Sequence, residues 1–282
     1  MTDTAFRLAE ILDALEGVGV TCLVLGGHAA RYYGVERTTS DFDLHLAPDG
    51  WPDLPERLVR SPLLAGRPAI EGPSWRPNDF RRFQIGRLPD GREEWLEFWR
   101  HNHLLPPFGD LFARREEGSY GGRRISFFSL PDLIRSKETE RASDWLDVER
   151  LEEILDARLL AGVSSGTIEV AAALAQLRSR TGLQGHLERG HLGDETAVER
   201  AMSQARGPIT LAYLLPSAPR ATGHSSLARI DAVIVNRLVS VVPGSPLHLA
   251  LVEAVRRLYK LSCQEADRAD KQAILAAQGG AG

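Results

Sequence analysis

The sequence predicts an α/β (α+β) protein whose N-terminal half combines strands with helices and whose C-terminal half is helical. Three observations lead to this prediction: apolar residues with helical spacing near the start of the chain, strict alternation of polar and apolar residues over Asp41–Leu46, and alanine- and leucine-rich segments after Gly162. The 282 residues suffice for one large or two modest domains. We expect two, residues 1–160 and residues 161–282.

The first elements follow from periodicity and from glycines. Residues Phe6–Leu15 predict a helix whose apolar side chains share one face: Leu8, Ile11, Leu12 and Leu15. The apolar run Thr21–Leu25 is long enough for a buried strand. Gly26-Gly27 ends this strand, and His28–Tyr33 then predicts a short helix.

Strands are expected in the next part of the chain. Over Asp41–Leu46 the side chains alternate with the period of a half-buried strand. A stretch rich in proline and glycine follows, with a predicted helix near residues 52–59. Then Phe83–Leu88 and Trp95–Trp99 flank Pro89-Asp90-Gly91, a turn sequence typical of a hairpin.

A capping pattern marks the start of the next helix. Residues Ile125–Phe128 predict a further strand, and Ser129 with Asp132 three residues later predicts a helix start. We expect this helix to continue through Arg141 to about Leu160. Toward the C-terminus, stretches rich in Gly, Pro and Ser separate helical segments at residues 182–193 and 216–226, and residues 230–235 suit a strand or a helix.

Composition places the chain among ordinary globular proteins, because 43% of its residues are hydrophobic and 26% are charged. The formal net charge of −4 argues against a broad basic surface that holds nucleic acid by charge alone. Two cysteines, Cys22 and Cys263, are too few for a disulfide framework. No apolar run reaches the ~18 residues of a membrane span and the N-terminus does not resemble a signal peptide, so we expect a cytoplasmic protein without a membrane partner.

Asp41 and Asp43 lie one residue apart on the predicted strand, so their carboxylates project from the same face. Paired carboxylates at this spacing suit a hard cation such as Mg²⁺, held together with substrate phosphates. Two acids on an exposed strand face can equally be solvated. His45 shares this face, where it suits either a structural role or an approach to the metal.

Gly26 and Gly27 stand between the preceding strand and the short helix. Glycines at this point let backbone N–H groups approach a phosphate closely, and the helix N-terminus adds a favourable dipole. The glycines and the two aspartates would lie at the ends of neighbouring strands, so a phosphate and a metal can share one cleft. Arg37, just before the acidic strand, can hold an anionic ligand or lie on the surface.

The run GGHAARYYGVERTTSDFDL, residues 26–44, resembles the signature of the nucleotidyltransferase superfamily, which has the DNA polymerase β-like fold. The matching positions are a glycine pair, an Arg-x-Thr element and Asp-x-Asp on a strand, here Gly26-Gly27, Arg37, Thr39, Asp41 and Asp43. The run is most similar to the AbiEii-like branch, which includes toxin nucleotidyltransferases and relatives that modify antibiotics. The resemblance covers residues 20–160, and it implies a mixed sheet with flanking helices, an NTP donor and Mg²⁺.

The superfamily also places a third carboxylate on a later strand, between apolar residues. Glu97 in the run Trp95–Trp99 fits this description, because strand alternation places it on the polar face. The resemblance therefore implies a metal site made of Asp41, Asp43 and Glu97, with Glu94 as the second choice for the third ligand.

A charged segment, residues 133–155, supports the same resemblance. On a continuous helix four residues would form one stripe: Lys137, Arg141, Asp144 and Val148. The AbiEii-like branch has a similar lysine, arginine and aspartate. This implies that Lys137 binds nucleotide phosphates and that Asp144, or Asp147 as second choice, acts near the acceptor as an acid/base or positioning residue. Charges of this kind also line ordinary solvated helix faces.

The leading hypothesis is an enzyme that moves a nucleoside monophosphate from an NTP to a hydroxyl acceptor, with two Mg²⁺ ions at the carboxylates. The acceptor stays open among an RNA end such as that of tRNA, a protein side chain and a small molecule. The resemblance alone suggests a toxin–antitoxin system with a cognate antitoxin as partner. The alternative is a catalytically silent nucleotide-binding or protein-interaction module on the same fold. A glycosyltransferase or phosphatase ranks last, because Arg37–Ser40 rather than an apolar run precedes the aspartates.

Overall fold

The structure is a computed structural model that describes residues 4–61, 70–71, 79–88, 91–169, 172–173, 177–179, 181–182 and 246–279. The chain divides into two compact units, Met1–Lys137 with Lys271–Gly282, and Glu138–Asp270. They are named the first and the second unit, and each is described by itself. The division falls earlier in the chain than the boundary expected between residues 160 and 161, which stays a prediction.

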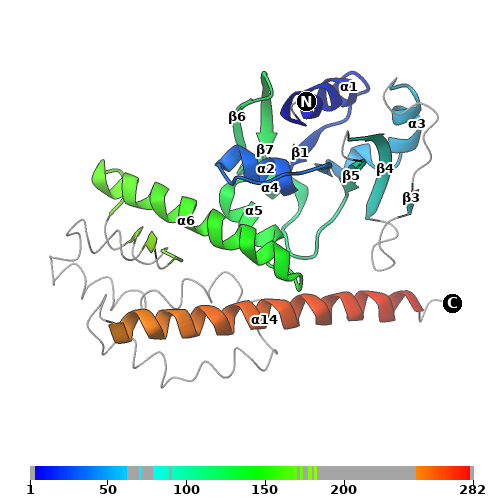
Figure 1. Ribbon diagram of the computed structural model, residues 1–282. Helices are drawn as coiled ribbons and strands as arrows, with labels where there is room; N and C mark the ends of the chain where they lie inside the picture. Colours follow the sequence, from blue (N-terminus) through cyan, green and yellow to red (C-terminus); the bar gives the residue numbers. More distant parts are fainter. Residues whose placement is uncertain are drawn as a thin grey trace. The chain divides into compact units, whose positions relative to one another are not determined.

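In the described residues of the first unit, seven strands form one sheet in the order β3-β4-β5-β2-β1-β7-β6 (Figure 1). The strands are β1 (Cys22–Val24), β2 (Asp41–Leu46), β3 (Ile70–Glu71), β4 (Phe80–Arg87), β5 (Glu93–Trp99), β6 (Glu116–Tyr120) and β7 (Arg123–Phe127). β2 pairs with β5, and β1 with β7, in parallel, whereas the other neighbours are antiparallel. The predicted α/β class and the mixed sheet are thus confirmed.

Strand β6 was not predicted from the sequence. Its residues, Glu116–Tyr120, include two acids, a glycine and a serine, and they alternate between half-buried and exposed. The strand forms because Gly121 and Gly122, with φ of 60° and 79°, turn the chain into a hairpin with β7. The two adjacent glycines were the available signal for this hairpin.

Short helices flank the sheet of the first unit. They are α1 (Thr4–Glu16), α2 (Gly26–Tyr33), α3 (Leu54–Val59), α4 (Phe108–Ala113) and α5 (Leu130–Ser136), with a 3₁₀ turn at Pro48–Gly50. α1 buries the predicted apolar face, including Leu8 and Ile11 at 0% exposure. The predicted cap of α5 is confirmed, since the Asp132 N–H donates to Ser129 Oγ over 3.3 Å.

Helix α2 covers the apolar face of the sheet. Its His28 ring stacks on Phe42 of β2 with centroids 4.9 Å apart, and Tyr32 stacks on Phe127 of β7 at 4.1 Å. Phe42 and Phe127 are fully buried. Because successive side chains of a strand point to opposite faces, Asp41 and Asp43 project from the other side of the sheet.

The predicted single helix from Ser129 to about Leu160 is wrong, because two helices occupy this segment. α5 ends at Ser136 and α6 (Ala142–Ser164) begins after Arg141. Between them the Arg141 N–H donates to Thr139 Oγ1 over 3.1 Å, and Trp145 Nε1 donates to the Thr139 carbonyl over 2.8 Å. Such local side-chain hydrogen bonds compete with the helix ladder. The stripe expected from Lys137 to Val148 on one helix therefore does not exist.

The second unit is helical in its described residues, as the sequence predicts. It contains α6, short helical pieces at residues 172–173 and 181–182, and α14 (Pro246–Gly279) as far as residue 270. Four buried residues form a small apolar cluster: Leu159, Leu160, Ala173 and Leu177. The predictions for residues 183–193, 216–226 and 230–235 lie outside the described residues. Within the described part of the whole chain, no helix has the length and apolar character to span a membrane.

Candidate active site

Three neighbouring strands place one charged residue each in a single row across the sheet. Asp43 of β2 lies directly across from Glu97 of the parallel strand β5, and Glu97 lies across from Arg82 of the antiparallel strand β4. Cross-strand partners share a face, so all three side chains project from the side opposite to α2. Asp41 is on the same face, across from Trp95.

The register also distinguishes Glu97 from Glu94, the second choice for the third carboxylate. Glu94 lies across from Gly86, where a Cβ would be 2.1 Å from Glu94 Oε2. Because the two glutamates are three residues apart on one strand, they point to opposite faces. Only Glu97 joins the row of Asp43.

The carboxylates of this row strongly influence one another. Burial raises the pKa of Glu97 to about 8, with further contributions from the charges of Asp43 and Asp41 and from a hydrogen bond to Asp43. The charge of Arg82 acts in the opposite direction. Neighbouring carboxylates resist ionising together, so the protonated Glu97 donates its hydrogen bond to Asp43. A cation bound beside these groups would favour loss of the Glu97 proton and ionisation of the carboxylates.

Gly26 brings the start of α2 into contact with Asp43. Its φ of 66° lies in the left-handed region, and a Cβ here would be 1.9 Å from Asp43 Oδ2. A Cβ on Gly27 would be 2.5 Å from Thr39 Oγ1. Only glycine therefore lets the N-terminus of α2 approach the acidic strand this closely.

The N-terminus of α2 has no side-chain cap, since Leu25 stands at the N-cap position. The first N–H groups of a helix have no partner within the helix, and they attract anions. The first residue of this helix, Gly26, lies next to the Asp43 carboxylate. A bound phosphate and a bound cation could therefore neutralise each other at this point.

The donor set fits Mg²⁺ in kind, because Asp41, Asp43 and Glu97 supply carboxylate oxygens and Gly26 leaves the side of Asp43 clear of a Cβ. Across the part of the chain that the structure describes, however, no three His, Cys, Asp or Glu side chains have the mutual spacing of a metal-ligand group. Glu97 is hydrogen-bonded to Asp43 instead. The metal site stays a prediction.

His45, on the same strand and face as the two aspartates, is buried. The imidazole is 2% exposed and packs against Phe108 of α4 and against Phe128, with ring centroids 5.7 and 5.8 Å away. Burial lowers the pKa of His45 to about 4, so the ring is neutral at pH 7. His45 is thus packed beneath α4, whereas Asp41 and Asp43 are half-buried at the open part of the face.

Two further predicted phosphate ligands lie in the first unit. Arg37 is exposed, in the segment between α2 and β2. Lys137 is 7% exposed and directly follows α5 as its C-cap residue. Their roles on nucleotide phosphates stay predictions.

Both candidate aspartates of the charged segment lie on α6 in the second unit. Asp144 is 5% exposed and accepts two hydrogen bonds from Arg141, Nε to Oδ2 at 2.8 Å and Nη2 to Oδ1 at 3.0 Å. Thr139 Oγ1 donates a third. Asp147 is 8% exposed. Asp144 therefore stabilises the start of α6, and its catalytic role stays a prediction.

Arg82 was not predicted from the sequence as a residue of this site. Its guanidinium lies over the Trp95 ring, 4.1 Å from the ring centroid, and beside Glu97. Counting back from the hairpin turn pairs Glu97 with Phe83. In the structure Glu97 pairs with Arg82 instead, because a bulge at Gln84–Gly86 shifts the register by one residue. Only the structure reveals that Arg82 and Glu97 are partners.

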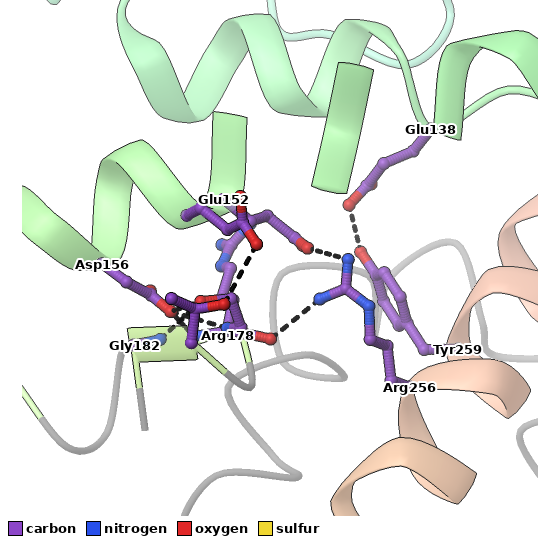
Figure 2. A network of polar contacts seen from close by, with 10 residues as sticks. Glu138, Glu152, Asp156, Arg178, Gly182, Arg256 and Tyr259 are labelled. Carbon is purple, nitrogen blue, oxygen red and sulfur yellow. Dashed lines mark hydrogen bonds and ion pairs between the residues drawn. The ribbon is translucent and has the colours of Figure 1, made fainter. Parts of the chain in front are cut away.

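A second group of acids, on α6 in the second unit, is embedded in a buried polar network (Figure 2). Glu152 is 1% exposed, and its Oε2 lies 2.5 Å from Arg256 Nη2 of α14. Arg256 Nη1 also donates to the Arg178 carbonyl over 2.9 Å, and Tyr259 donates to Glu138. Burial raises the pKa of Glu152 to about 7, against the lowering effect of Arg256.

Asp156 completes this network. It is 0% exposed and accepts hydrogen bonds from the N–H groups of Arg178 and Ser179, at 2.9 and 2.6 Å, and from Ser179 Oγ at 2.6 Å. Burial raises the pKa of Asp156 to about 6 although these donors lower it. These contacts join α6 to Arg178 and Ser179, so the network has a structural role.

No protein-family model and no curated protein matches the chain. The lincosamide antibiotic adenylyltransferase LnuA, solved with lincomycin bound, is 18% identical, with 52% of this chain and 96% of that protein aligned at a TM-score of 0.38. An antigenic nucleotidyltransferase-like protein from Paracoccidioides brasiliensis is 17% identical, with 72% of this chain and 89% of that protein aligned at a TM-score of 0.38. JHP933 from Helicobacter pylori is 13% identical over 99% of both chains, with a TM-score of 0.36. Similarities this distant assign neither a family nor an activity to this chain.

Proposed function

We propose that the protein is a Mg²⁺-dependent nucleotidyltransferase, which moves a nucleoside monophosphate from an NTP to a hydroxyl acceptor. The observation that carries the proposal is the contact of Gly26, at the uncapped start of α2, with Asp43, which has Glu97 directly across the sheet. Nucleotidyl transfer needs a triphosphate and a cation at one point. Backbone N–H groups suit the first and carboxylate oxygens the second.

The carboxylates, the glycine pair and two basic residues have separate roles in this proposal. Asp41, Asp43 and Glu97 would hold Mg²⁺, which when bound activates the acceptor oxygen and neutralises the charge of the departing pyrophosphate. The N–H groups of Gly26 and Gly27 would bind triphosphate oxygens. Arg37 would add positive charge from the segment before β2, and the sequence resemblance assigns Lys137 to the same phosphates.

Calorimetric titration with each NTP, with and without Mg²⁺, tests the proposal. We expect wild type to bind at least one NTP only when Mg²⁺ is present, and the variant Asp41→Ala/Asp43→Ala to lose this binding. The matched control is Asp49→Ala/Asp53→Ala, which removes the same charge from exposed positions and should bind like wild type. The proposal is overturned if wild type binds no NTP, or if the variant at Asp41 and Asp43 binds as tightly as the control.

A catalytically silent nucleotide-binding or protein-interaction module is the second candidate. Two observations favour it: Glu97 is hydrogen-bonded to Asp43, and the described residues contain no metal-ligand group of three. This candidate predicts NTP binding that does not depend on Mg²⁺, without release of pyrophosphate. Pyrophosphate release in the presence of Mg²⁺ would exclude it.

The run of residues 26–44 supports a narrower form of the proposal, a toxin of the AbiEii-like branch with a cognate antitoxin. The support is the match of the glycine pair, Arg37, Thr39 and the two aspartates in one run. Bacteria that express the wild-type chain should then stop growing, whereas bacteria that express Asp43→Ala should grow normally. Equal growth of both strains would remove the toxin role and leave the nucleotidyltransferase proposal intact.

A further inference from the structure

We infer that Arg82 selects the acceptor. The hydroxyl compound that receives the nucleotide carries an oxyanion group, a phosphate or a carboxylate, and this group binds the Arg82 guanidinium. The inference rests on the proposed nucleotidyltransferase function, because it concerns the acceptor of the same site. It excludes cationic acceptors, which would face a like charge at this position.

Arg82 lies against an aromatic ring, and one of its hydrogen-bond donors has no partner in the described part of the chain. The guanidinium lies over Trp95, 4.1 Å from the ring centroid, a favourable cation–π contact. Its Nε is shielded from solvent and has no hydrogen-bond partner among the described residues. A shielded N–H group without a partner is unfavourable, so the geometry points to a ligand that satisfies it.

The neighbouring Glu97 does not use these donors. Glu97 lies directly across from Arg82 and feels its charge, but its hydrogen bond goes to Asp43 on the other side. The preceding residue of β4, Arg81, points to the opposite face of the sheet, where its guanidinium lies over the buried Trp51 ring. Arg82 therefore keeps a guanidinium on the face that carries Asp43 and Glu97, and the planar fork of N–H donors of this group matches carboxylates and phosphates.

The order of the strands decides which substrate Arg82 would touch. The triphosphate-binding N–H groups of the proposal follow β1, whereas Arg82 lies on β4, and β2 and β5 stand between them. With neighbouring strands ~4.8 Å apart, Arg82 is about 10 Å from the strand of Asp43, on the side away from Gly26. In an in-line transfer the attacking oxygen and the departing pyrophosphate lie on opposite sides of the phosphorus. A triphosphate at α2 thus places the acceptor on the side of Arg82.

The test uses hydroxyl compounds that differ only in an oxyanion group. The full-length protein, saturated with Mg²⁺ and a non-hydrolysable analogue of the NTP it binds, is titrated with ribose 5-phosphate against ribose and with glycerate against glycerol. We expect the charged member of at least one pair to bind tenfold or more tightly than the neutral one. The phosphate pair and the carboxylate pair distinguish the two forms of oxyanion.

Two variants connect this preference to Arg82. Arg82→Gln should bind both members of the pair equally while its affinity for the NTP stays within twofold of wild type, which also shows that it is folded. The matched control Arg87→Gln removes the same charge from the same strand, at a side chain that is 65% exposed and paired with Glu93, and it should keep the preference.

The outcomes separate this inference from the function on which it rests. If wild type binds no NTP, the proposed function fails and the inference with it. If NTP binds but charged and neutral probes bind equally or not at all, the inference alone is overturned. It is also overturned if Arg82→Gln retains the preference, or if this variant loses tenfold or more in NTP affinity, because Arg82 would then belong to the triphosphate.

Discussion

Acidic side chains have opposite environments in the two units. In the first unit Asp41, Asp43 and Glu97 are half-buried on an open sheet face, and their mutual repulsion contributes to the raised pKa of Glu97. In the second unit Glu152 and Asp156 are almost fully buried, and each faces a donor or a cation. Burial alone therefore does not identify a functional acid. Carboxylates that face one another are candidates for binding a ligand, whereas carboxylates that face donors stabilise the fold.

The largest expected effect on stability is in the buried network. Arg256→Met leaves the Glu152 carboxylate buried without its cation, and we expect it to lower the free energy of unfolding by about 3–5 kcal/mol. Arg87→Met, which breaks an exposed pair with Glu93 at 3.6 Å, should cost less than about 0.5 kcal/mol. Urea unfolding of the two variants measures both values. Equal losses would contradict the contrast between the units.

At the sheet face, we expect removal of a charged side chain to raise the stability of the fold rather than lower it. Asp43→Asn removes one of the facing carboxylates, so above the Glu97 pKa of about 8, where both groups are ionised in wild type, the free energy of unfolding should exceed the wild-type value by about 1 kcal/mol. At the same time the affinity for Mg²⁺·NTP should fall about 100-fold, since a metal ligand is lost. Urea unfolding and calorimetry provide the two measurements. A variant clearly less stable than wild type would show that Asp43 stabilises the fold as Asp156 does.

The buried network should also make stability depend on pH. Burial raises the pKa of Glu152 from 4.5 to about 7, so the folded protein keeps a proton that the unfolded chain loses first. The contribution of this proton to the free energy of unfolding is complete below pH 4.5 and is lost as the pH rises through 7. The loss is about 3 kcal/mol at most. Hydrogen exchange of α6 between pH 5 and pH 8 measures it. In Glu152→Gln the pH dependence should shrink, and an unchanged slope would assign it to other groups.

Two glycine-to-alanine variants separate backbone strain from the contact with Asp43. Alanine at Gly26 or at Gly34 forces a side chain into the left-handed region, where φ is 66° and 107°, at about 1–2 kcal/mol each. A Cβ on Gly34 meets no heavy atom within 4 Å, whereas one on Gly26 collides with Asp43. Only Gly26→Ala should therefore also weaken NTP binding, tenfold or more. Equal NTP affinities in the two variants would separate Gly26 from the site.

Much of the first unit could be predicted because its elements carry local signals. The alternation over Asp41–Leu46 gives the bounds of β2, and Ser129 caps α5 as its spacing with Asp132 predicts. Prediction failed where side chains rather than periodicity end an element. Thr139 turns the chain between α5 and α6, an effect that helical spacing cannot show.

Local features of the chain establish which chemistry this protein can present: carboxylates on one face of a strand, and a glycine pair where a helix begins close to that strand. These features depend on neighbours in the chain, through side-chain alternation and the steric freedom of glycine. The pairing of distant strands, in contrast, places Glu97 across from Asp43 and Arg82 beside Glu97. Parallel pairing of distant strands follows from how their apolar faces pack, and a one-residue bulge in β4 set the partner of Glu97.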